Sequence, residues 1–409
     1  MNKDLPLLQP YPFEKLAQLK QGSLPPKHLD HIALSIGEPQ HPAPQFVVES
    51  LIRHLHQLSN YPSTRGSNEL RAAIAAWLST RFDIAADLID PEINLLPVSG
   101  TREALFAIAQ CIVDRNAANP LVFLPNPFYQ IYEGGALLAG ASPIFLDCLP
   151  DNGFLPDLDQ VEAKQWANCQ MIYICNPGNP TGTVMSTRYL QQLIELAHQY
   201  DFVIASDECY SEIFFDETNP PPGLLGVAAA MGNDSFSHCL AFHSLSKRSN
   251  LPGLRSGFVA GDARILEKFL LYRTYHGCAL PPATQTASTA AWSDEAHVVE
   301  NRKLYRQKFE QVLALLSDTL APQKPQAGFY LWAKTPISDT EFAQRLYAEQ
   351  NVTVLPGRFL ARDHGDGNPG ENRVRMALVA PLDECVDAAV RINALLAAQI
   401  GRASCRERV

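Results

Sequence analysis

Residues 242–257 form a polar stretch in the middle of the chain, and they read Phe242-His243-Ser244-Leu245-Ser246-Lys247-Arg248-Ser249-Asn250-Leu251-Pro252-Gly253-Leu254-Arg255-Ser256-Gly257. Uncharged runs at 239–242 and 257–261 flank it, and each has the length and composition of a buried strand. Polar groups at the edge of a buried sheet are costly unless they bind something charged. A lysine at that place has two uses: it grips an anion, or it reacts with a carbonyl as a Schiff base.

Two other interpretations of Lys247 compete with these uses. An arbitrary lysine is most often a solvated surface residue. Ser244-x-x-Lys247 also matches the serine–lysine pattern of penicillin-binding enzymes, which additionally requires Ser-Asp-Asn and Lys-Thr-Gly. The chain contains neither motif, and its nearest approach is Lys334-Thr335-Pro336. We therefore set that pattern aside, and the choice between a surface lysine and a Schiff base depends on residues further upstream.

Length and composition bound the fold and the partners. With 409 residues and 46% hydrophobic content, the chain can bury a large core, in one large and one smaller domain. A net charge of −10 argues against nucleic acid or an anionic membrane as the main partner. No uninterrupted apolar stretch approaches the roughly 18 residues of a membrane helix, and the N-terminus lacks the apolar core of a signal peptide. The nine cysteines include no Cys-x-x-Cys pair, so we expect reduced thiols, no metal site and a cytoplasmic protein.

Strand and helix patterns alternate through most of the chain. Strand patterns recur at 93–98, 121–124, 171–175 and 202–205, with helical patterns between them. This alternation predicts an α/β fold with a mainly parallel sheet and helices on both faces. Beyond about residue 290, a long charged helix at 296–320 opens a region of α+β texture.

The domain boundaries follow from this change of texture. We expect an N-terminal arm with part of the small domain at 1–45, a large domain at 46–290 and a small domain at 291–400. Residues 401–409 turn abruptly basic and aperiodic, and we interpret them as a non-native tail after a final helix that ends near residue 400.

Polar groups follow four of the predicted strands. In strand order they are Gly100 with Thr101, then Tyr129, then Asn179, then Asp207 with Tyr210. Each is ambiguous alone, because Thr and Asp at strand ends are commonly helix caps, Asn-Pro is common turn material, and a tyrosine can be a core aromatic. The carboxyl ends of parallel strands meet at one edge of a sheet, where ligands bind. Together with Lys247, these groups match one ligand, pyridoxal 5′-phosphate.

Each part of that cofactor has residues to receive it. Lys247 can react with the aldehyde. Asp207 can keep the ring nitrogen protonated, which the ring needs in order to accept electrons from a carbanion. Asn179 and Tyr210 can donate to the phenolic oxygen. The phosphate requires a helix N-terminus and a guanidinium, supplied by Gly100, Thr101, Ser244 and Arg255.

With these residues, the chain resembles the fold-type I pyridoxal-phosphate aminotransferases, the aspartate aminotransferase superfamily (class I/II), over about residues 5–400. The motifs that carry the resemblance are Asn179-Pro180-Thr181-Gly182, Asp207-x-x-Tyr210, Ser244-x-Ser246-Lys247 with Arg255 eight residues on, and Val374-Arg375-Met376. The resemblance implies a large domain with a mainly parallel seven-stranded sheet, a smaller α+β domain, and a homodimer with shared active sites.

The resemblance also implies roles for individual residues at the cofactor. Lys247 is the Schiff-base lysine, Asp207 and Tyr210 act beside it as catalytic residues, and Tyr129 stacks on the cofactor ring. Further cofactor contacts are implied for Gly100, Thr101, Arg102, Asn179, Ser244, Ser246 and Arg255.

Other implied roles concern the substrate and the second subunit. Arg375 binds the substrate α-carboxylate as a bidentate pair, together with Asn179. Gly37 belongs to the loop that closes over the substrate, and Tyr61 reaches the phosphate in the partner subunit's site.

A finer resemblance is to the succinyldiaminopimelate aminotransferases of bacterial lysine and diaminopimelate biosynthesis. It is carried by the phrases at 8–13, 246–250, 275–282 and 368–370. It implies transamination between L-glutamate/2-oxoglutarate and N-succinyl-2-amino-6-oxopimelate. That acceptor has three carboxylates, and the candidate cations for them are Arg65, Arg102 and Arg248, with Tyr11 and Phe13 covering the succinyl end.

Three alternatives stay open at this point. The same fold hosts aminotransferases for aspartate, alanine or aromatic acids, and it hosts C–S β-lyases. A non-enzymatic regulator that senses the cofactor is a remote alternative, because such proteins carry a basic DNA-binding module ahead of the fold, and here the acidic fold begins within about 30 residues of Met1.

Overall fold

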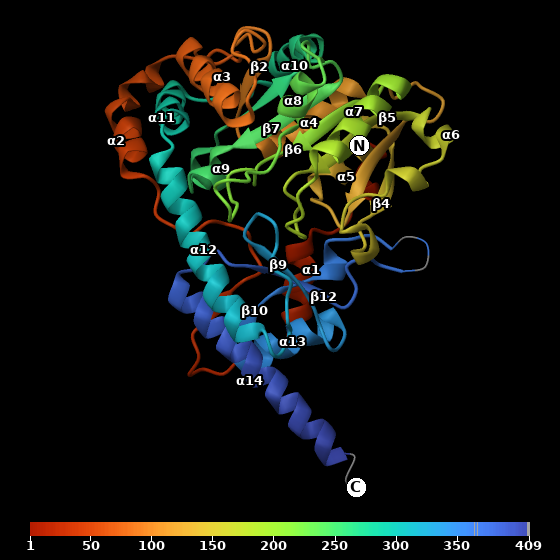
Figure 1. Ribbon diagram of the computed structural model, residues 1–409, viewed down its shortest axis with the longest axis vertical. Helices are drawn as coiled ribbons and strands as arrows, with labels where there is room; N and C mark the ends of the chain where they lie inside the picture. The colour runs from red at the N-terminus through yellow and green to blue at the C-terminus, as the bar shows by residue number, and fades with distance from the viewer. Residues whose placement is uncertain (364, 366, 407–409) are drawn as a thin grey trace.

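A seven-stranded sheet forms the centre of the computed structural model, which describes residues 1–363, 365 and 367–406 (Figure 1). The strand order is β2-β8-β7-β6-β5-β3-β4. Strand β8 is antiparallel to β2 and β7, whereas all other neighbours pair in parallel. The strands are β2 Leu95–Val98, β3 Leu121–Asn126, β4 Ser142–Asp147, β5 Cys169–Cys175, β6 Val203–Asp207, β7 Cys239–Ser244 and β8 Gly257–Gly261. The predicted α/β fold with a mainly parallel seven-stranded sheet is confirmed.

Helices cover both faces of this sheet, because successive residues of a strand point to opposite sides. Phe123 of β3 packs in one apolar cluster with Ile74, and its neighbour Val122 packs in another with Leu105. The helices of the first face are α3 Asn68–Phe82, α7 Thr187–Tyr200, α8 Leu224–Ala230 and α11 Pro282–Trp292. Those of the second face are α4 Thr101–Ile112, α5 Ile131–Ala139 and α10 Ala263–His276. Burial on both sides explains why the strands are apolar along nearly their whole length.

A smaller unit lies below the large sheet in Figure 1. Its antiparallel sheet has the order β11-β12-β9, and β1 pairs with β10 in parallel, so that the start of the chain lies beside its last quarter. Helix α12 runs from the large unit down to this one (Figure 1). The strands are β1 Ile32–Ala33, β9 Tyr330–Lys334, β10 Val352–Thr353, β11 Leu355–Pro356 and β12 Arg373–Ala377. The remaining helices are α1 Pro12–Lys20, α2 Gln45–Arg53, α6 Ala163–Trp166, α9 Leu245–Arg248, α12 Ala296–Leu316, α13 Asp339–Gln350 and α14 Leu382–Arg406.

Several elements differ from the sequence-based expectation. The polar stretch after β7 contains the four-residue helix α9, whose start is capped by Ser244 Oγ accepting from the Ser246 amide at 3.0 Å. Strand β4 was not expected, because Pro143 interrupts its apolar run; it lies at the sheet edge, where proline is tolerated. Helix α14 continues to Arg406 instead of ending near residue 400, and residues 407–409 of the expected tail lie outside the described part. Among the described residues, none of the helices combines the length and the apolar composition that a membrane span requires.

Candidate active site

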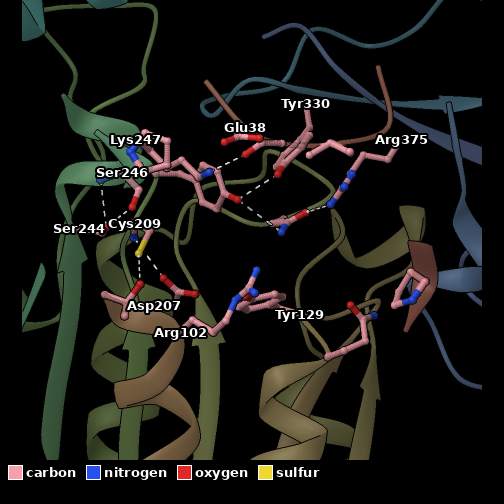
Figure 2. Close-up of a pocket in the computed structure, with 18 of the residues that line it drawn as sticks. Glu38, Arg102, Tyr129, Asp207, Cys209, Ser244, Ser246, Lys247, Tyr330 and Arg375 are labelled. Atoms are coloured by element: carbon pink, nitrogen blue, oxygen red, sulfur yellow. Dashed lines mark hydrogen bonds between the residues drawn. The ribbon is translucent and has the colours of Figure 1, made fainter. Parts of the chain in front are cut away.

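A cavity of about 660 Å³ opens where the carboxyl ends of β5, β6 and β7 face the small unit (Figure 2). Its walls also include parts of the N-terminal segment and of β12. Twelve of the predicted site residues line it: Gly37, Thr101, Arg102, Tyr129, Asn179, Asp207, Tyr210, Ser244, Ser246, Lys247, Arg255 and Arg375. Most of these residues belong to or neighbour strands of the large sheet, whose parallel strands share one edge with their carboxyl ends, whereas Gly37 lies in the N-terminal segment and Arg375 in β12 of the small unit.

Lys247 projects into this cavity from α9. Its Nζ donates a hydrogen bond to Gly37 O at 2.5 Å and lies 5.5 Å from the centre of the Phe329 ring. Burial is the main cause that lowers the pKa of Lys247 to about 8, and the positive charges of Arg375 and Arg102 lower it in the same direction. Roughly a tenth of the amine is therefore neutral at pH 7, far more than at the ordinary pKa of a lysine, and a nucleophile or a general base requires this neutral form.

Asp207 ends β6 at the floor of the cavity. Tyr132 Oη donates to its Oδ2 at 2.7 Å, and the Cys209 amide donates to its Oδ1 at 3.2 Å. Burial raises the pKa of Asp207, while the hydrogen bonds from Cys209 and Tyr132 oppose that rise. A buried carboxylate that has two donors, and that forms no ion pair with any cation of the described residues, fits a positively charged ring nitrogen.

A chain of polar side chains crosses the cavity toward Arg375. Asn179 Nδ2 donates to Tyr210 Oη at 3.5 Å, and the hydroxyls of Tyr210 and Tyr330 lie 3.0 Å apart. Arg375 donates from Nη1 to Asn179 Oδ1 at 3.0 Å and from Nη2 to Ser35 O at 2.8 Å. Its guanidinium also lies 4.5 Å from the centre of the Tyr330 ring.

Arg375 is 5% exposed, and no described carboxylate forms an ion pair with it. Its buried Nε has no hydrogen-bond partner in the described part of the chain. A guanidinium fixed through two neutral acceptors, with a donor left over, suits a ligand carboxylate.

A second group of donors gathers at the start of α4. Gly100 precedes this helix with φ +87°, and a Cβ at that position would lie 2.2 Å from Arg255 Nη2, so glycine allows the guanidinium to approach. Thr101 begins the helix, whose first backbone amides have no partner within the helix, and it lines the same cavity as Ser244 and Ser246. A cluster of hydroxyls, one guanidinium and a helix N-terminus fits a phosphate dianion.

Tyr129 follows β3 on the opposite wall from Lys247. Arg102 Nε donates to its hydroxyl at 2.6 Å, and burial raises the pKa of Tyr129. The bond holds the tyrosine ring in the wall, where a flat ligand ring could lie against it. The donor and acceptor sets at all these positions fit pyridoxal phosphate.

Three residues expected near the ligands do not reach the cavity of their own chain. Tyr61 is fully exposed and borders a separate hollow, and its predicted contact with a partner subunit stays a prediction. Arg65 donates to Glu92 O at 2.5 Å on the rim of another hollow. Arg248 turns into the core, where it pairs with Glu295 and lies 4.8 Å from the Trp292 ring centre. Its charge is neutralised internally, so the expectation that it binds a substrate carboxylate is wrong.

Sequence reasoning missed four residues of this site. Glu38 and Cys209 line the cavity, Tyr330 bonds with Tyr210, and Tyr132 bonds with Asp207. One of them carried a signal, because Glu38 directly follows Gly37; Tyr132 lies in α5, whereas Tyr129 precedes that helix. The chain offered no comparable signal for Tyr330, which sits in an apolar strand.

Known proteins are similar to this chain over almost its whole length. The family model "Aminotransferase class I and II" matches residues 30–391. The LL-diaminopimelate aminotransferase of Syntrophobacter fumaroxidans is 31% identical over 398 residues, which cover 96% of this chain and 97% of the relative. An aminotransferase structure from Neisseria meningitidis Z2491 has a TM-score of 0.92 at 47% identity and covers 97% of this chain and 100% of its own. A "probable N-succinyldiaminopimelate aminotransferase" from Thermus thermophilus has a TM-score of 0.81 at 25% identity, over 94% of this chain and 100% of its own.

Proposed function

The chain belongs to the class I and II aminotransferases, and we propose that it transfers the amino group of L-glutamate to N-succinyl-2-amino-6-oxopimelate. Its cofactor is pyridoxal 5′-phosphate, which supplies an aldehyde that reacts with the amino group and a ring that accepts the electrons left behind when the α-carbon loses its proton. The single observation that carries the proposal is the cavity between Lys247, Asp207 and Arg375, with donors arranged for a carboxylate at one end and a phosphate at the other.

The residues of the cavity divide the work of the two half-reactions. Arg375 holds the α-carboxylate of whichever substrate is bound, and Asn179 orients that guanidinium through its Oδ1. Lys247 Nζ, once free, takes the proton from the α-carbon of glutamate and later returns a proton to the α-carbon of the product. Its lowered pKa of about 8 favours the neutral amine that the first of these steps needs. Asp207 keeps a positive charge at the floor of the cavity, where the tyrosine and amide donors hold its carboxylate in place.

The part of the cavity wall around Tyr129, whose hydroxyl accepts from Arg102, supports a long, acidic acceptor. Arg102 is exposed there, and Tyr11, Phe13 and Gln130 line the same region. A guanidinium beside aromatic rings suits an acyl chain that ends in a carboxylate. Of the cations considered earlier, Arg102 is the one that lines the cavity, so we propose it as the partner of the succinyl carboxylate.

A second candidate substrate is unmodified LL-diaminopimelate. Relatives such as that of Syntrophobacter fumaroxidans carry its name, and Glu38, an exposed carboxylate in the cavity wall, could pair with its free distal ammonium. Succinylation removes that ammonium and adds a carboxylate. Glu38 therefore favours unmodified LL-diaminopimelate, and Arg102 favours the succinylated substrate.

A single-turnover comparison tests these candidates. The enzyme is mixed with N-succinyl-LL-diaminopimelate, LL-diaminopimelate, aspartate, alanine or an aromatic amino acid, and the change in cofactor absorbance is followed. We expect the succinylated donor to react at least about tenfold faster, which corresponds to about 1.4 kcal/mol. A comparable preference for LL-diaminopimelate selects the second candidate, and no preference for either refutes both and leaves the family standing. Release of pyruvate and ammonia from cystathionine without a keto acid identifies a β-lyase instead.

We also propose that the active unit is a homodimer in which Tyr61 completes the phosphate site of the other subunit. Tyr61 is fully exposed, and Ile52 and Leu58 near it in the chain are each 61% exposed, an apolar set that contact with a second copy would cover. Sedimentation of the wild type and of Leu58→Glu tests the dimer: we expect the variant to dissociate and to lose affinity for the cofactor. A monomeric, fully active wild type contradicts this proposal.

A further inference from the structure

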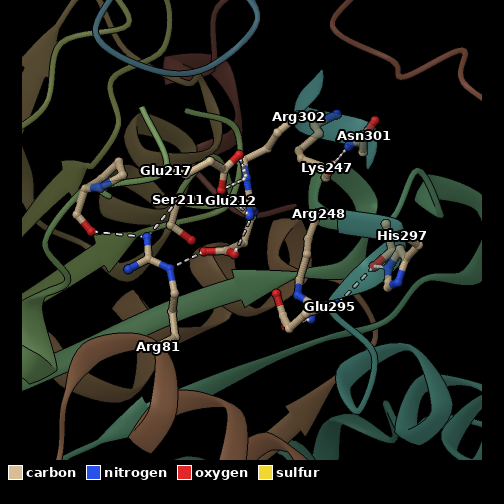
Figure 3. A network of polar contacts seen from close by, with 12 residues as sticks. Arg81, Ser211, Glu212, Glu217, Lys247, Arg248, Glu295, His297, Asn301 and Arg302 are labelled. Carbon is tan, nitrogen blue, oxygen red and sulfur yellow. Dashed lines mark hydrogen bonds and ion pairs between the residues drawn. The ribbon is translucent and has the colours of Figure 1, made fainter. Parts of the chain in front are cut away.

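Asn301, in the second turn of α12, joins three parts of the chain that meet behind Lys247. Its Nδ2 donates to Lys247 O at 3.4 Å, and its Oδ1 accepts from Asn250 Nδ2 at 3.0 Å. The same oxygen lies 2.7 Å from His41 Nδ1. An amide oxygen can only accept, so His41 carries its proton on Nδ1. Asn301 itself is 3% exposed, and Figure 3 shows its side chain beside the main chain of Lys247.

The first of these parts is the turn that carries Lys247. Helix α9 has only four residues, and the last carbonyls of so short a helix have few partners within it. The turn is closed by Asn250, whose left-handed conformation (φ 53°) ends the helix. Because Asn301 bonds both the carbonyl of Lys247 and the side chain of Asn250, it holds this turn from its far side.

The second part is the segment 37–41, which covers the amine of Lys247. At one end of the segment, Gly37 O accepts from Lys247 Nζ, and a Cβ on Gly37 would come within 1.9 Å of Tyr330 Oη. At its other end, the His41 ring packs against Tyr305 with ring centres 4.7 Å apart. The segment is thus fixed at both ends, and Asn301 is the residue that ties its His41 end to the turn of Lys247.

The third part is α12, which holds Asn301 firmly in place. The next residue, Arg302, forms an ion pair with Glu217 at 2.8 Å, and Arg306 one turn later bonds the same carboxylate at 2.6 Å. Arg302 is 5% exposed, and Glu212 lies 3.6 Å from its Nη1 (Figure 3). This network anchors the start of α12 to the segment after β6, in the large unit.

We propose that Asn301 is a positioning residue for transamination, which keeps the segment 37–41 and the turn of Lys247 in register with each other. The proposal rests on the family's reaction and not on the choice of keto acid. The bond from Lys247 Nζ to Gly37 O must break whenever the amine reacts or moves a proton. The hydrogen bonds of Asn301 involve neither that amine nor a substrate, so they persist. They keep the segment 37–41 over the cavity while the amine of Lys247 reacts or moves a proton.

Loss of Asn301 should therefore admit water to Lys247. Burial is the main cause of its lowered pKa, so the pKa should move from about 8 toward the ordinary value of 10.5. The proton transfers should also slow, because small displacements of a catalytic group cost much of its rate.

The test uses Asn301→Leu, His41→Leu, the double variant, and His41→Asn, which keeps a donor near the place of Nδ1. Asn393→Leu is the matched control, because Asn393 is an exposed asparagine that bonds Leu315 O and Thr319 far from the cavity. The first readout is the pH profile of acylation of Lys247 in the cofactor-free protein, followed by mass spectrometry. The second is the split between kcat and KM for glutamate in the holoenzyme.

We expect the acylation midpoint of Asn301→Leu to rise by about one pH unit, and kcat to fall on the order of tenfold, with a smaller change in KM. His41→Leu should change the acylation midpoint and kcat by the same amounts as Asn301→Leu, and the double variant should change them no further than either single variant. His41→Asn should restore most of the wild-type values. Unchanged acylation and kcat in Asn301→Leu overturn the proposal, as do additive effects of the two single variants. If Asn301→Leu fails to fold, His41→Leu decides alone. Acylation requires no substrate, so an error in the substrate assignment leaves this result intact.

Discussion

Replacing Tyr132 by phenylalanine should weaken Asp207 as an anion. Tyr132 is fully buried, donates to Asp207 Oδ2 at 2.7 Å, and stacks on Tyr173 with ring centres 4.7 Å apart. Phenylalanine preserves the stacked ring and its volume, so the substitution creates no cavity beyond the missing hydroxyl. What it removes is one hydrogen bond to a carboxylate in a place with little water.

The size of the effect follows from that hydrogen bond. A bond to a charged acceptor contributes about 1.5–3 kcal/mol, which corresponds to a pKa rise of about one to two units for Asp207. Burial already places the pKa of Asp207 above its ordinary value. At pH values between the ordinary pKa of an aspartate and the raised pKa of folded Asp207, the folded cofactor-free protein therefore binds a proton that the unfolded chain does not. Its free energy of unfolding falls as pH rises through this window. Tyr132→Phe should extend this window upward.

The assay is the affinity of the cofactor-free protein for pyridoxal phosphate as a function of pH, together with the pH profile of kcat/KM. We expect the acidic limb of both profiles to move up by about one to two pH units. Tyr173→Phe is the control, because it removes a buried hydrogen bond of similar kind, from its hydroxyl to Leu105 O at 2.5 Å, outside the cavity. Tyr173→Phe should lower the free energy of unfolding without shifting the acidic limb of either pH profile. A Tyr132→Phe profile that coincides with the wild type refutes the reasoning.

Three further predictions concern Lys247 and Arg375. Lys247→Ala removes the amine that moves the α-proton, so single turnover with glutamate should slow by roughly 10² or more; turnover at the parent's speed contradicts the mechanism. Lys247→Met should alter the stability of the cofactor-free protein: between pH 8 and 10.5 the unfolded chain binds a proton that folded Lys247 does not, so wild-type stability rises through this range. That rise is at most about 3 kcal/mol, and urea unfolding should find it missing in the variant. Arg375→Lys replaces a planar fork by a point charge, so KM for glutamate should rise roughly 10- to 100-fold; an unchanged KM shows that the carboxylate binds elsewhere.

The sheet and most of the site were predictable because they depend on local patterns. Apolar runs bounded by turn residues identify β5, β6 and β7, and a parallel sheet brings their carboxyl ends together whatever the details of the helices. Asp207 is the last residue of β6, Asn179 comes four residues after the end of β5, and Lys247 comes three residues after the end of β7, so knowing the strands is enough to gather them at one cavity.

Contacts that depend on side-chain direction were not predictable in this way. Arg248 is next to Lys247 in sequence, and a loop would have allowed both to face the ligand. Instead α9 rotates successive side chains by about 100°, so that Arg248 enters the core toward Glu295 while Lys247 enters the cavity. Tyr330 reaches Tyr210 across the gap between two sheets, and no local pattern records a register between separate sheets.

The two central ionisable groups of this site require opposite charge states from one environment. Burial favours the neutral amine of Lys247, and it disfavours the carboxylate of Asp207. The hydrogen bonds correct for this difference: Asp207 receives donors from Tyr132 and from the Cys209 amide, which stabilise its charge, whereas the Lys247 amine meets a neutral carbonyl of Gly37, which leaves it free to lose a proton. A carboxylate in place of that carbonyl would keep the lysine protonated. It follows that a neutral acceptor at Gly37 matters to the reaction, because the charge of the neighbouring Glu38 already acts to raise the pKa of Lys247.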